Sequence, residues 1–177
     1  RDRVHTLRWE DVPKSAQCAA KNVVLDTIGA ILAGSQLSEN AAFAQLATKL
    51  GGKGPASLFG HSIRVPALFA ALVNATAGVA LEVDEGNRLG GGHPSVHVTP
   101  GAIAVAEELG LSGTEVLMSI IVGYEVISRI GTGTSVRAEV HSHGTWGAIG
   151  AAAATARLMD FDKANTRRAL NLSMSMS

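Results

Sequence analysis

The sequence predicts an all-α fold of about seven helices, arranged as a single domain over residues 1–177. Hydrophobic residues make up 46% of the chain but aromatic residues only 4%. The apolar mass is therefore mostly Ala, Val, Leu and Ile, which suit closely packed helices. Apolar residues recur at helical spacing along most of the chain, and only residues 56–60 (ASLFG) resemble a strand. A chain of this length can bury a substantial core without being divided.

Residues that commonly begin or end helices divide the chain into helical segments. Pro66 suits the first turn of a helix, Ser112 and Glu115 have capping-box spacing, and Gly34 is expected to end the first helix as a C-cap. Asp160 or Asp162 is expected to cap the last helix. The seven predicted segments are residues 13–34, 38–52, 66–84, 101–110, 116–131, 146–160 and 163–177.

Charge and composition exclude several classes of partner. The formal net charge is zero at pH 7, which argues against nucleic acid or an anionic membrane surface as a partner. No stretch approaches the roughly 18 uninterrupted apolar residues of a membrane span, and Arg1 begins no signal-peptide pattern. The single Cys18 cannot form an intramolecular disulfide and is expected to be a small buried thiol. We expect a soluble, cytoplasmic protein.

Two polar segments interrupt the apolar chain at junctions between predicted helices. The first is EVDEGNRLGGGHPSVH, residues 82–97, and the second is EVHSHGTWG, residues 139–147. Imidazole titrates near neutral pH, so a histidine can remove a proton beside a carboxylate and return it elsewhere. Two histidine-bearing loops facing each other across a cleft would suit this chemistry. The helix start near Gly144 offers backbone N–H groups for an anionic substrate.

A metal site is the first alternative for these residues. His93 and His97 are four residues apart, and His141 and His143 could add ligands. However, Pro94 and the preceding glycines make the segment before His97 a poor helix, and the sequence has no HExxH motif and no EF-hand spacing. We therefore expect no metal.

Structural roles are the second alternative. The acidic residues of 82–85 could form a solvated helix C-terminus, although negative charge there opposes the helix dipole. The glycine run 90–92 could be a hinge. Trp146 is expected to anchor the core, Tyr124 to be a buried, hydrogen-bonded phenol, and His61 to be an exposed turn residue.

The motifs around these segments resemble those of the MmgE/PrpD family, which includes methylcitrate dehydratase, cis-aconitate decarboxylase and iminodisuccinate epimerase. The resemblance rests on ALEVDEG, GGGHPSVHVTPGAIAVAEELGLSG, IIVGYEVISRIG and HSHGTWGAIGAAAATARLMDFD, and on the opening LRWEDVPKSAQCAAKNVVLDTIGAILAGS. It implies a large helical domain with a smaller α+β lid domain, assembled as a homodimer. It also implies proton abstraction beside a carboxylate of a small di- or tricarboxylate, without a metal or organic cofactor.

The resemblance can be transferred residue by residue. The histidine of the family's HPS block falls on His93, and its second histidine falls on His141, with His143 at a position usually held by Thr. The family's acidic cluster falls on residues 82–86, where Glu82 replaces the usual Asp and Gly86 the usual Thr. The predicted catalytic residues are His93, His141 and Glu82, and the predicted substrate-binding residues are Asp84, Glu85 and Gly144.

Two functional interpretations follow from the resemblance. Family members continue well beyond 177 residues, so we expect this chain to be the N-terminal part of a longer protein, without the lid. Under the first interpretation it belongs to a lyase or isomerase in which His93 and His141 exchange protons with a polycarboxylate, whether by dehydration, epimerisation or decarboxylation. Under the second it is a truncated, non-catalytic helical scaffold or dimerising fragment of such an enzyme.

Overall fold

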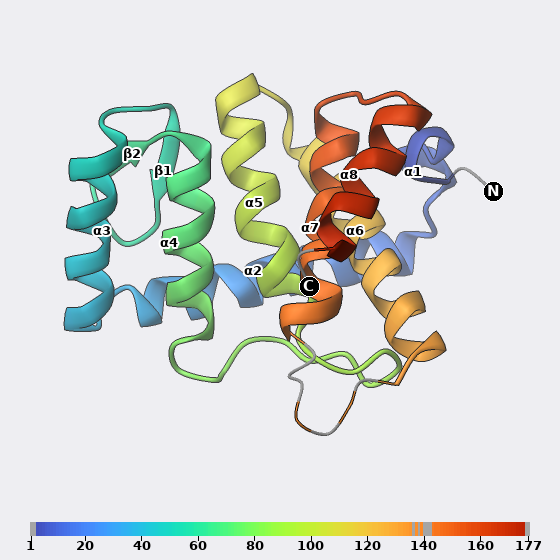
Figure 1. Ribbon diagram of the computed structural model, residues 1–177, viewed down its shortest axis with the longest axis horizontal. Helices are drawn as coiled ribbons and strands as arrows, with labels where there is room; N and C mark the ends of the chain where they lie inside the picture. Colours follow the sequence, from blue (N-terminus) through green and yellow to red (C-terminus); the bar gives the residue numbers. More distant parts are fainter. Residues whose placement is uncertain (1–2, 136, 138, 140–142, 176–177) are drawn as a thin grey trace.

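The computed structural model describes residues 3–135, 137, 139 and 143–175, and it confirms the helical fold (Figure 1). Within these residues, eight α-helices, one 3-10 helix and one two-stranded sheet follow one another along the chain. Their bounds are α1 Arg3–Thr6, η1 Trp9–Asp11, α2 Lys14–Gly34, α3 Ser38–Gly51, β1 Ala56–Leu58, β2 Ile63–Val65, α4 Ala67–Val79, α5 Pro94–Leu109, α6 Gly113–Gly133, α7 His143–Leu158 and α8 Lys163–Ser175.

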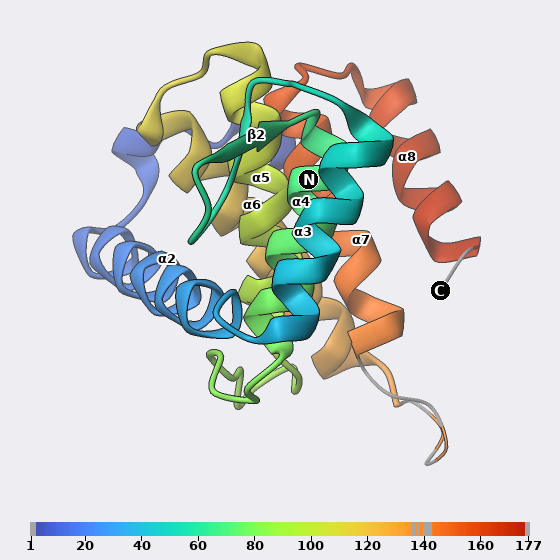
Figure 2. The same cartoon turned by 90° about the vertical axis from the view of Figure 1, so that its left-hand side faces the viewer.

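The helices pack as a layered bundle around α4, α5 and α7. Helix α4 packs against α2, α3 and α5, whereas α7 packs against α5, α6 and α8. Figure 1 shows α3, α4 and α5 standing side by side with α2 running across them, and Figure 2 shows α2 and α8 on opposite sides of the bundle. Helix α5 therefore lies in the middle of the molecule, so the side chains at its start are held in place by the surrounding helices.

Two hydrophobic clusters fill the interior, one on each side of α5. The first joins α3, α4 and the sheet, and the second joins α5, α6 and α7, with Trp146 packed against it as the sequence predicts. The first cluster contains Ala44, Ala47, Ala56, Leu58, Val65, Ala70, Val73 and Ala104. The second contains Val98, Ala102, Ala106, Ile120, Ile127, Ala154 and Leu158.

Small residues let the helix backbones approach closely. A Cβ atom added to Gly34 of α2 would lie 1.9 Å from the carbonyl oxygen of Ala77 in α4. A Cβ atom on Gly123 of α6 would lie 2.7 Å from the carbonyl oxygen of Gly150 in α7. Gly34 is the last residue of α2, and the C-cap is Ser35 rather than Gly34 as predicted. A glycine is needed at position 34 because of the close contact with α4.

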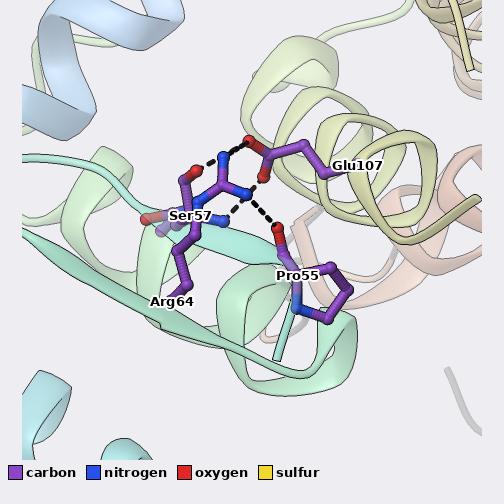
Figure 3. A network of polar contacts seen from close by, with 5 residues as sticks. Pro55, Ser57, Arg64 and Glu107 are labelled. Atoms are coloured by element: carbon purple, nitrogen blue, oxygen red, sulfur yellow. Dashed lines mark hydrogen bonds and ion pairs between the residues drawn. The ribbon is translucent and has the colours of Figure 1, made fainter. Parts of the chain in front are cut away.

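The two-stranded sheet is attached to α5 by a polar network (Figure 3). Strands β1 and β2 pair antiparallel, and Ser57 lies opposite Arg64 in the register. The carboxylate of Glu107, in the last turn of α5, accepts hydrogen bonds from the Ser57 amide at 2.6 Å and the Ser57 hydroxyl at 2.7 Å. Arg64 donates to Glu107 at 3.4 Å and to the Pro55 carbonyl at 3.0 Å. The sheet is therefore fixed at the end of α5 opposite to the predicted site.

Two predicted helix starts have the expected caps. The Ser112 hydroxyl accepts the Glu115 amide at 3.3 Å while the Glu115 carboxylate accepts the Ser112 amide at 2.7 Å, which confirms the capping box. Asp162 rather than Asp160 caps α8, because its Oδ1 accepts the Asn165 amide at 2.7 Å.

The largest differences from the predicted helix bounds are at the end of α4 and the start of α5. Helix α4 ends at Val79 rather than at residue 84, because the chain then turns and runs as a loop across the end of α6. Helix α5 begins at Pro94, where we expected a poor helix, and Pro94 occupies the first helical position. Proline suits this position because its missing N–H has no intrahelical partner there in any case. His97 consequently lies on a helix.

Two side-chain environments near the surface and one strand also differ from the prediction. Cys18 is exposed rather than buried, because the buried face of α2 runs through Gln17, Ala20 and Thr27 and Cys18 points to the side of it. Strand β2, Ile63–Val65, lies outside residues 56–60, the one segment that resembles a strand in the sequence. His61 is half-buried rather than exposed, and its Nε2 is enclosed.

A row of hydroxyl groups joins α2 to the start of α5 in the interior. The Ser95 hydroxyl lies 2.5 Å from that of Thr27 and 2.9 Å from that of Thr99, and all three residues are fully buried. The Thr27 hydroxyl also donates to the Val23 carbonyl at 2.9 Å. Buried hydroxyls need such partners, so this row fixes the contact between the two helices.

By length and composition, α6 is the one helix within the described part of the chain that could cross a membrane. The same test also selects core helices of proteins without a membrane span, and α6 packs against α2, α5 and α7. This feature is therefore weak support for a membrane span.

Candidate active site

The loop between α4 and α5 carries most of the predicted site residues and is held tightly against α6. A Cβ atom on Gly90 would lie 2.8 Å from both the Cα and the carbonyl oxygen of Ser128, so only glycine fits there. Gly91 and Gly92 have φ angles of 73° and 70°, in the left-handed region that favours glycine. The glycine run is therefore a close-packed element, which argues against the hinge interpretation. In Figure 1 this loop is the light green segment that leads into α5.

Asn87 organises the same loop. Its side-chain oxygen accepts the amides of Leu89 at 2.8 Å and Gly90 at 2.9 Å, and its amide nitrogen donates to the Ser128 hydroxyl at 2.5 Å. Its backbone amide donates to the Gly92 carbonyl at 2.9 Å. One residue thus closes the loop on itself and ties it to α6.

His93 and Asp84 lie together at the start of α5. The side chain of Asp84 is 2% exposed, and its Oδ2 lies 3.2 Å from His93 Nδ1. The same Nδ1 lies 3.2 Å from the backbone carbonyl oxygen of Asp84, with hydrogen-bond geometry. A carbonyl oxygen can only accept, so this contact requires a proton on Nδ1. In the neutral ring Nε2 then carries the lone pair that can take a proton from a substrate.

Glu85 points to the interior and is held by two donors. Tyr124 of α6 donates to its Oε1 at 2.5 Å, and the Ser95 amide of α5 donates to its Oε2 at 3.0 Å. Burial raises the pKa of Glu85, while these two hydrogen bonds and the nearby His93 act in the opposite direction. Burial, followed by the hydrogen bond to Glu85, raises the pKa of Tyr124, so its phenol remains a donor. The prediction of a buried, hydrogen-bonded Tyr124 is confirmed.

Glu82 occupies a different environment from Asp84 and Glu85. It is exposed, and its φ of 53° lies in the left-handed region that non-glycine residues rarely adopt. Because α4 ends before it, and because Asp84 is buried, the acidic residues do not form a solvated helix C-terminus. The structure brings Asp84, Glu85 and His93 together but gives the Glu82 side chain no hydrogen bond or ion pair among the residues it describes.

The second polar segment is described only in part. His141 lies outside the described residues, and Gly144 is an exposed residue in the first turn of α7. Farther along α7, a Cβ atom on Gly147 would lie 2.5 Å from the ring of His97, and one on Gly91 would lie 3.6 Å from the ring of Trp146. The described parts of the two polar segments therefore meet where α7 packs against α5 and the loop.

The space at this meeting point is small. A crevice of about 10 Å³ is lined by residues of the loop, α5, α6 and α7, including His93, His97 and Trp146. This volume holds at most about one water molecule. Larger hollows of about 490 and 570 Å³ lie near the N-terminal segment and α6, and no predicted site residue lines them. Among the described residues, no group of three or more His, Cys, Asp or Glu could hold a metal ion.

The hydrogen-bond partners of this cluster could not be predicted from the sequence. Ser95, Asn87 and Ser128 hold Glu85 and the loop, yet nothing in their local sequence distinguishes them from ordinary polar residues. One signal was available: Pro94 directly after a histidine marks a helix start, which would have placed the amide of Ser95 in the first turn.

The fold and this cluster define a helical domain that presents a histidine paired with a buried carboxylate at the first turn of its central helix. The chain belongs to the MmgE/PrpD family, because residues 2–177 match the N-terminal domain of that family. It is 25% identical over 185 residues to a cis-aconitate decarboxylase-like protein of Aspergillus oryzae, covering 98% of this chain and 38% of that protein. It is 24% identical over 180 residues to the cis-aconitate decarboxylase of Aspergillus terreus, covering 97% of this chain and 37% of that enzyme.

The chain thus spans less than two fifths of the length of these curated relatives. The resemblance seen in the sequence motifs is confirmed at the level of the family.

Proposed function

We propose that this chain forms the helical N-terminal part of a lyase or isomerase that acts on a small di- or tricarboxylate by proton transfer beside a carboxylate. The observation that carries the proposal is the pairing of His93 with the buried Asp84 at the start of α5. The family match supports it, since both curated relatives are named for the decarboxylation of cis-aconitate or for likeness to that enzyme.

In this proposal His93 is the proton-transferring group. The Asp84 carbonyl keeps the proton on Nδ1, and the Asp84 carboxylate stabilises the imidazolium that forms when Nε2 takes a proton from carbon. The electron pair left on carbon then expels a neighbouring group or accepts a proton on the other face. His141, on the second polar segment, is the proposed partner for that second transfer.

The remaining predicted residues have proposed roles around the substrate. Glu82 is exposed beside the cluster, and its left-handed backbone is the kind of local strain that is often retained at functional sites. Gly144 lies in the first turn of α7, where backbone N–H groups and the helix dipole favour an anionic substrate. Because the crevice at His93 is small, the proposal gives the described residues one wall of a larger site for a polycarboxylate.

The test is turnover by the protein in its full natural length. Proton NMR in D2O would follow the C–H signals of cis-aconitate, citrate, methylcitrate and a stable iminodisuccinate analogue. We expect exchange or conversion of at least one compound, and a fall in kcat of about 10²–10⁴-fold in His93→Gln, since glutamine cannot take up a proton. His61→Gln, in the turn between β1 and β2, is the control and should retain kcat.

Two outcomes would refute the proposal. If folded protein leaves every compound of the panel unchanged, the alternative of a non-catalytic scaffold is supported. If His93→Gln retains the kcat of the unmodified protein, the role of His93 is wrong even though the family activity is present.

A further inference from the structure

His93 is the N-cap residue of α5, yet its side chain makes no capping hydrogen bond. The side chain of an N-cap residue normally accepts the amide of the second or third helical residue. In α5 the first helical residue is Pro94, which has no N–H, and the amide of the second, Ser95, donates to Glu85 at 3.0 Å. The cap of this helix is therefore supplied by the loop.

This external cap leaves the imidazole available for other contacts. A histidine side chain that capped its own helix would fold back over the first turn, where Glu85 now lies. Instead, the ring is turned to Asp84, with Nδ1 3.2 Å from the carbonyl oxygen. The orientation of the His93 ring therefore depends on Glu85 occupying the capping position.

Helix α6 in turn fixes Glu85. The Tyr124 hydroxyl donates to Oε1 at 2.5 Å, and one helical turn farther on the Ser128 hydroxyl accepts the amide nitrogen of Asn87 at 2.5 Å. The Thr132 hydroxyl also donates to the Leu89 carbonyl at 3.3 Å, so the loop is attached to α6 at three points and to α5 at one. Hydrogen bonds to a charged group in a partly buried site are stronger and shorter than neutral ones, which makes the Tyr124 contact the dominant one.

We propose that Glu85 and Tyr124 are positioning residues for His93: Glu85 caps α5 in place of His93, and Tyr124 holds Glu85 where it can do so. This role differs from the substrate-binding role that the family resemblance implies for Glu85. Both of its oxygens already accept hydrogen bonds from the protein, and a carboxylate placed against a polycarboxylate would repel it. The catalytic part of the inference rests on the proposed function, whereas the orientation of the ring does not.

The experiment compares Tyr124→Phe, Glu85→Ala and Glu85→Gln in the full-length protein. The readout that does not depend on activity is the ¹⁵N spectrum of the His93 imidazole, assigned by its loss in His93→Gln, which reports which nitrogen carries the proton. We expect the Nδ1–H form in the unmodified protein and in Glu85→Gln, whose amide oxygen can still accept the Ser95 amide. We expect mixed tautomers in Tyr124→Phe and Glu85→Ala.

The kinetic readout is the division of the effect between kcat and KM. A misplacement of about 1 Å at a catalytic group costs up to about 10²-fold, so we expect kcat to fall about 10- to 100-fold in Tyr124→Phe and Glu85→Ala with KM changed by less than about threefold. Glu125→Gln is the matched control, because this neighbouring carboxylate on α6 is exposed and pairs only with Arg129 among the described residues. It should leave both kcat and the tautomer unchanged.

The outcomes separate this inference from the proposed function. An Nδ1–H signal unchanged in both Tyr124→Phe and Glu85→Ala overturns the inference, whether or not the protein is active. A raised KM with an unchanged kcat also overturns it, because that pattern identifies Glu85 as a substrate ligand. A shifted tautomer in a protein that converts no polycarboxylate supports the positioning and refutes only the proposed function. If Glu85→Ala does not fold, Tyr124→Phe, which removes a single oxygen atom, decides.

Discussion

The contact between α2 and α4 at Gly34 gives a stability prediction with an internal control. An alanine at position 34 would place its Cβ 1.9 Å from the carbonyl oxygen of Ala77 and 2.9 Å from the carbonyl carbon. Both are backbone atoms, so no side chain can rotate away. Since Cβ atoms essentially never approach closer than 3.0 Å, and ordinary contact begins at 3.4 Å, the two helices must separate by about 1.1–1.5 Å.

The expected cost follows from this displacement. Overpacking a close helix contact typically costs about 1–3 kcal/mol, and more when backbone must move. Replacing glycine by alanine inside a helix returns about 0.5–1 kcal/mol. We therefore expect Gly34→Ala to lower the free energy of unfolding by about 2 kcal/mol, which corresponds to a fall in Tm of about 4–8 °C for a domain of this size.

Gly29, on the same helix, is the matched control. It is exposed, and a Cβ added there meets no atom within 4 Å. Gly29→Ala should therefore show only the gain in helix propensity, raising the free energy of unfolding by about 0.5–1 kcal/mol. Urea unfolding followed by far-UV circular dichroism measures both variants. Equal stability of the two variants, or a Gly34→Ala variant as stable as the unmodified protein, would refute the reasoning about the α2–α4 contact.

Two further predictions concern titration and the N-terminal segment. Because burial raises the pKa of Glu85 above its ordinary value of 4.5, the folded protein holds this proton more tightly than the unfolded chain. The stability contributed by Glu85 is the unfolding free energy of the unmodified protein minus that of Glu85→Gln. This difference should fall as the pH rises from 4.5 through the raised pKa of Glu85 in the folded protein. A difference that stays flat or rises across pH 4–7 contradicts this. The guanidinium of Arg157, in the last turn of α7, donates to the carbonyls of Val4 and Leu7. Arg157→Gln should weaken the amide hydrogen-exchange protection of residues 4–12 by about 1–2 kcal/mol, and unchanged protection there would count against this attachment.

The helical fold could be read from the sequence because its determinants are local. The Ser112 capping box and the apolar repeat of α6 each act within a few residues, and both predictions are confirmed. Cys18 shows the limit of the same reasoning. Apolar residues occur all round α2, with Leu25 71% exposed, so periodicity alone does not show which side faces the core. That side is determined by α4 and α5, which lie far away in sequence.

The titratable residues of the candidate site could be predicted from the sequence, but the different environments of their side chains could not. A loop with His93 and three carboxylates stands out in any mostly apolar chain. Sequence spacing does not show that Asp84 is buried and Glu85 half-buried while Glu82 is exposed, because this depends on how the loop crosses α6. The three glycines at 90–92 are explained only by that crossing, where the backbones of Gly90 and Ser128 touch.

The hydrogen bonds in the row of hydroxyls between α2 and α5 all run in the same direction from donor to acceptor. Each hydroxyl has a single proton. Thr27 donates its own to the Val23 carbonyl, so the 2.5 Å contact requires Ser95 to donate to Thr27, and Thr99 must then donate to Ser95. Sliding α5 by one residue along α2 would break the Ser95–Thr27 hydrogen bond and leave the buried Ser95 proton without this acceptor, at a cost of about 1–3 kcal/mol. Helix α5, which begins directly after His93, is thus held in a single axial register against its neighbour.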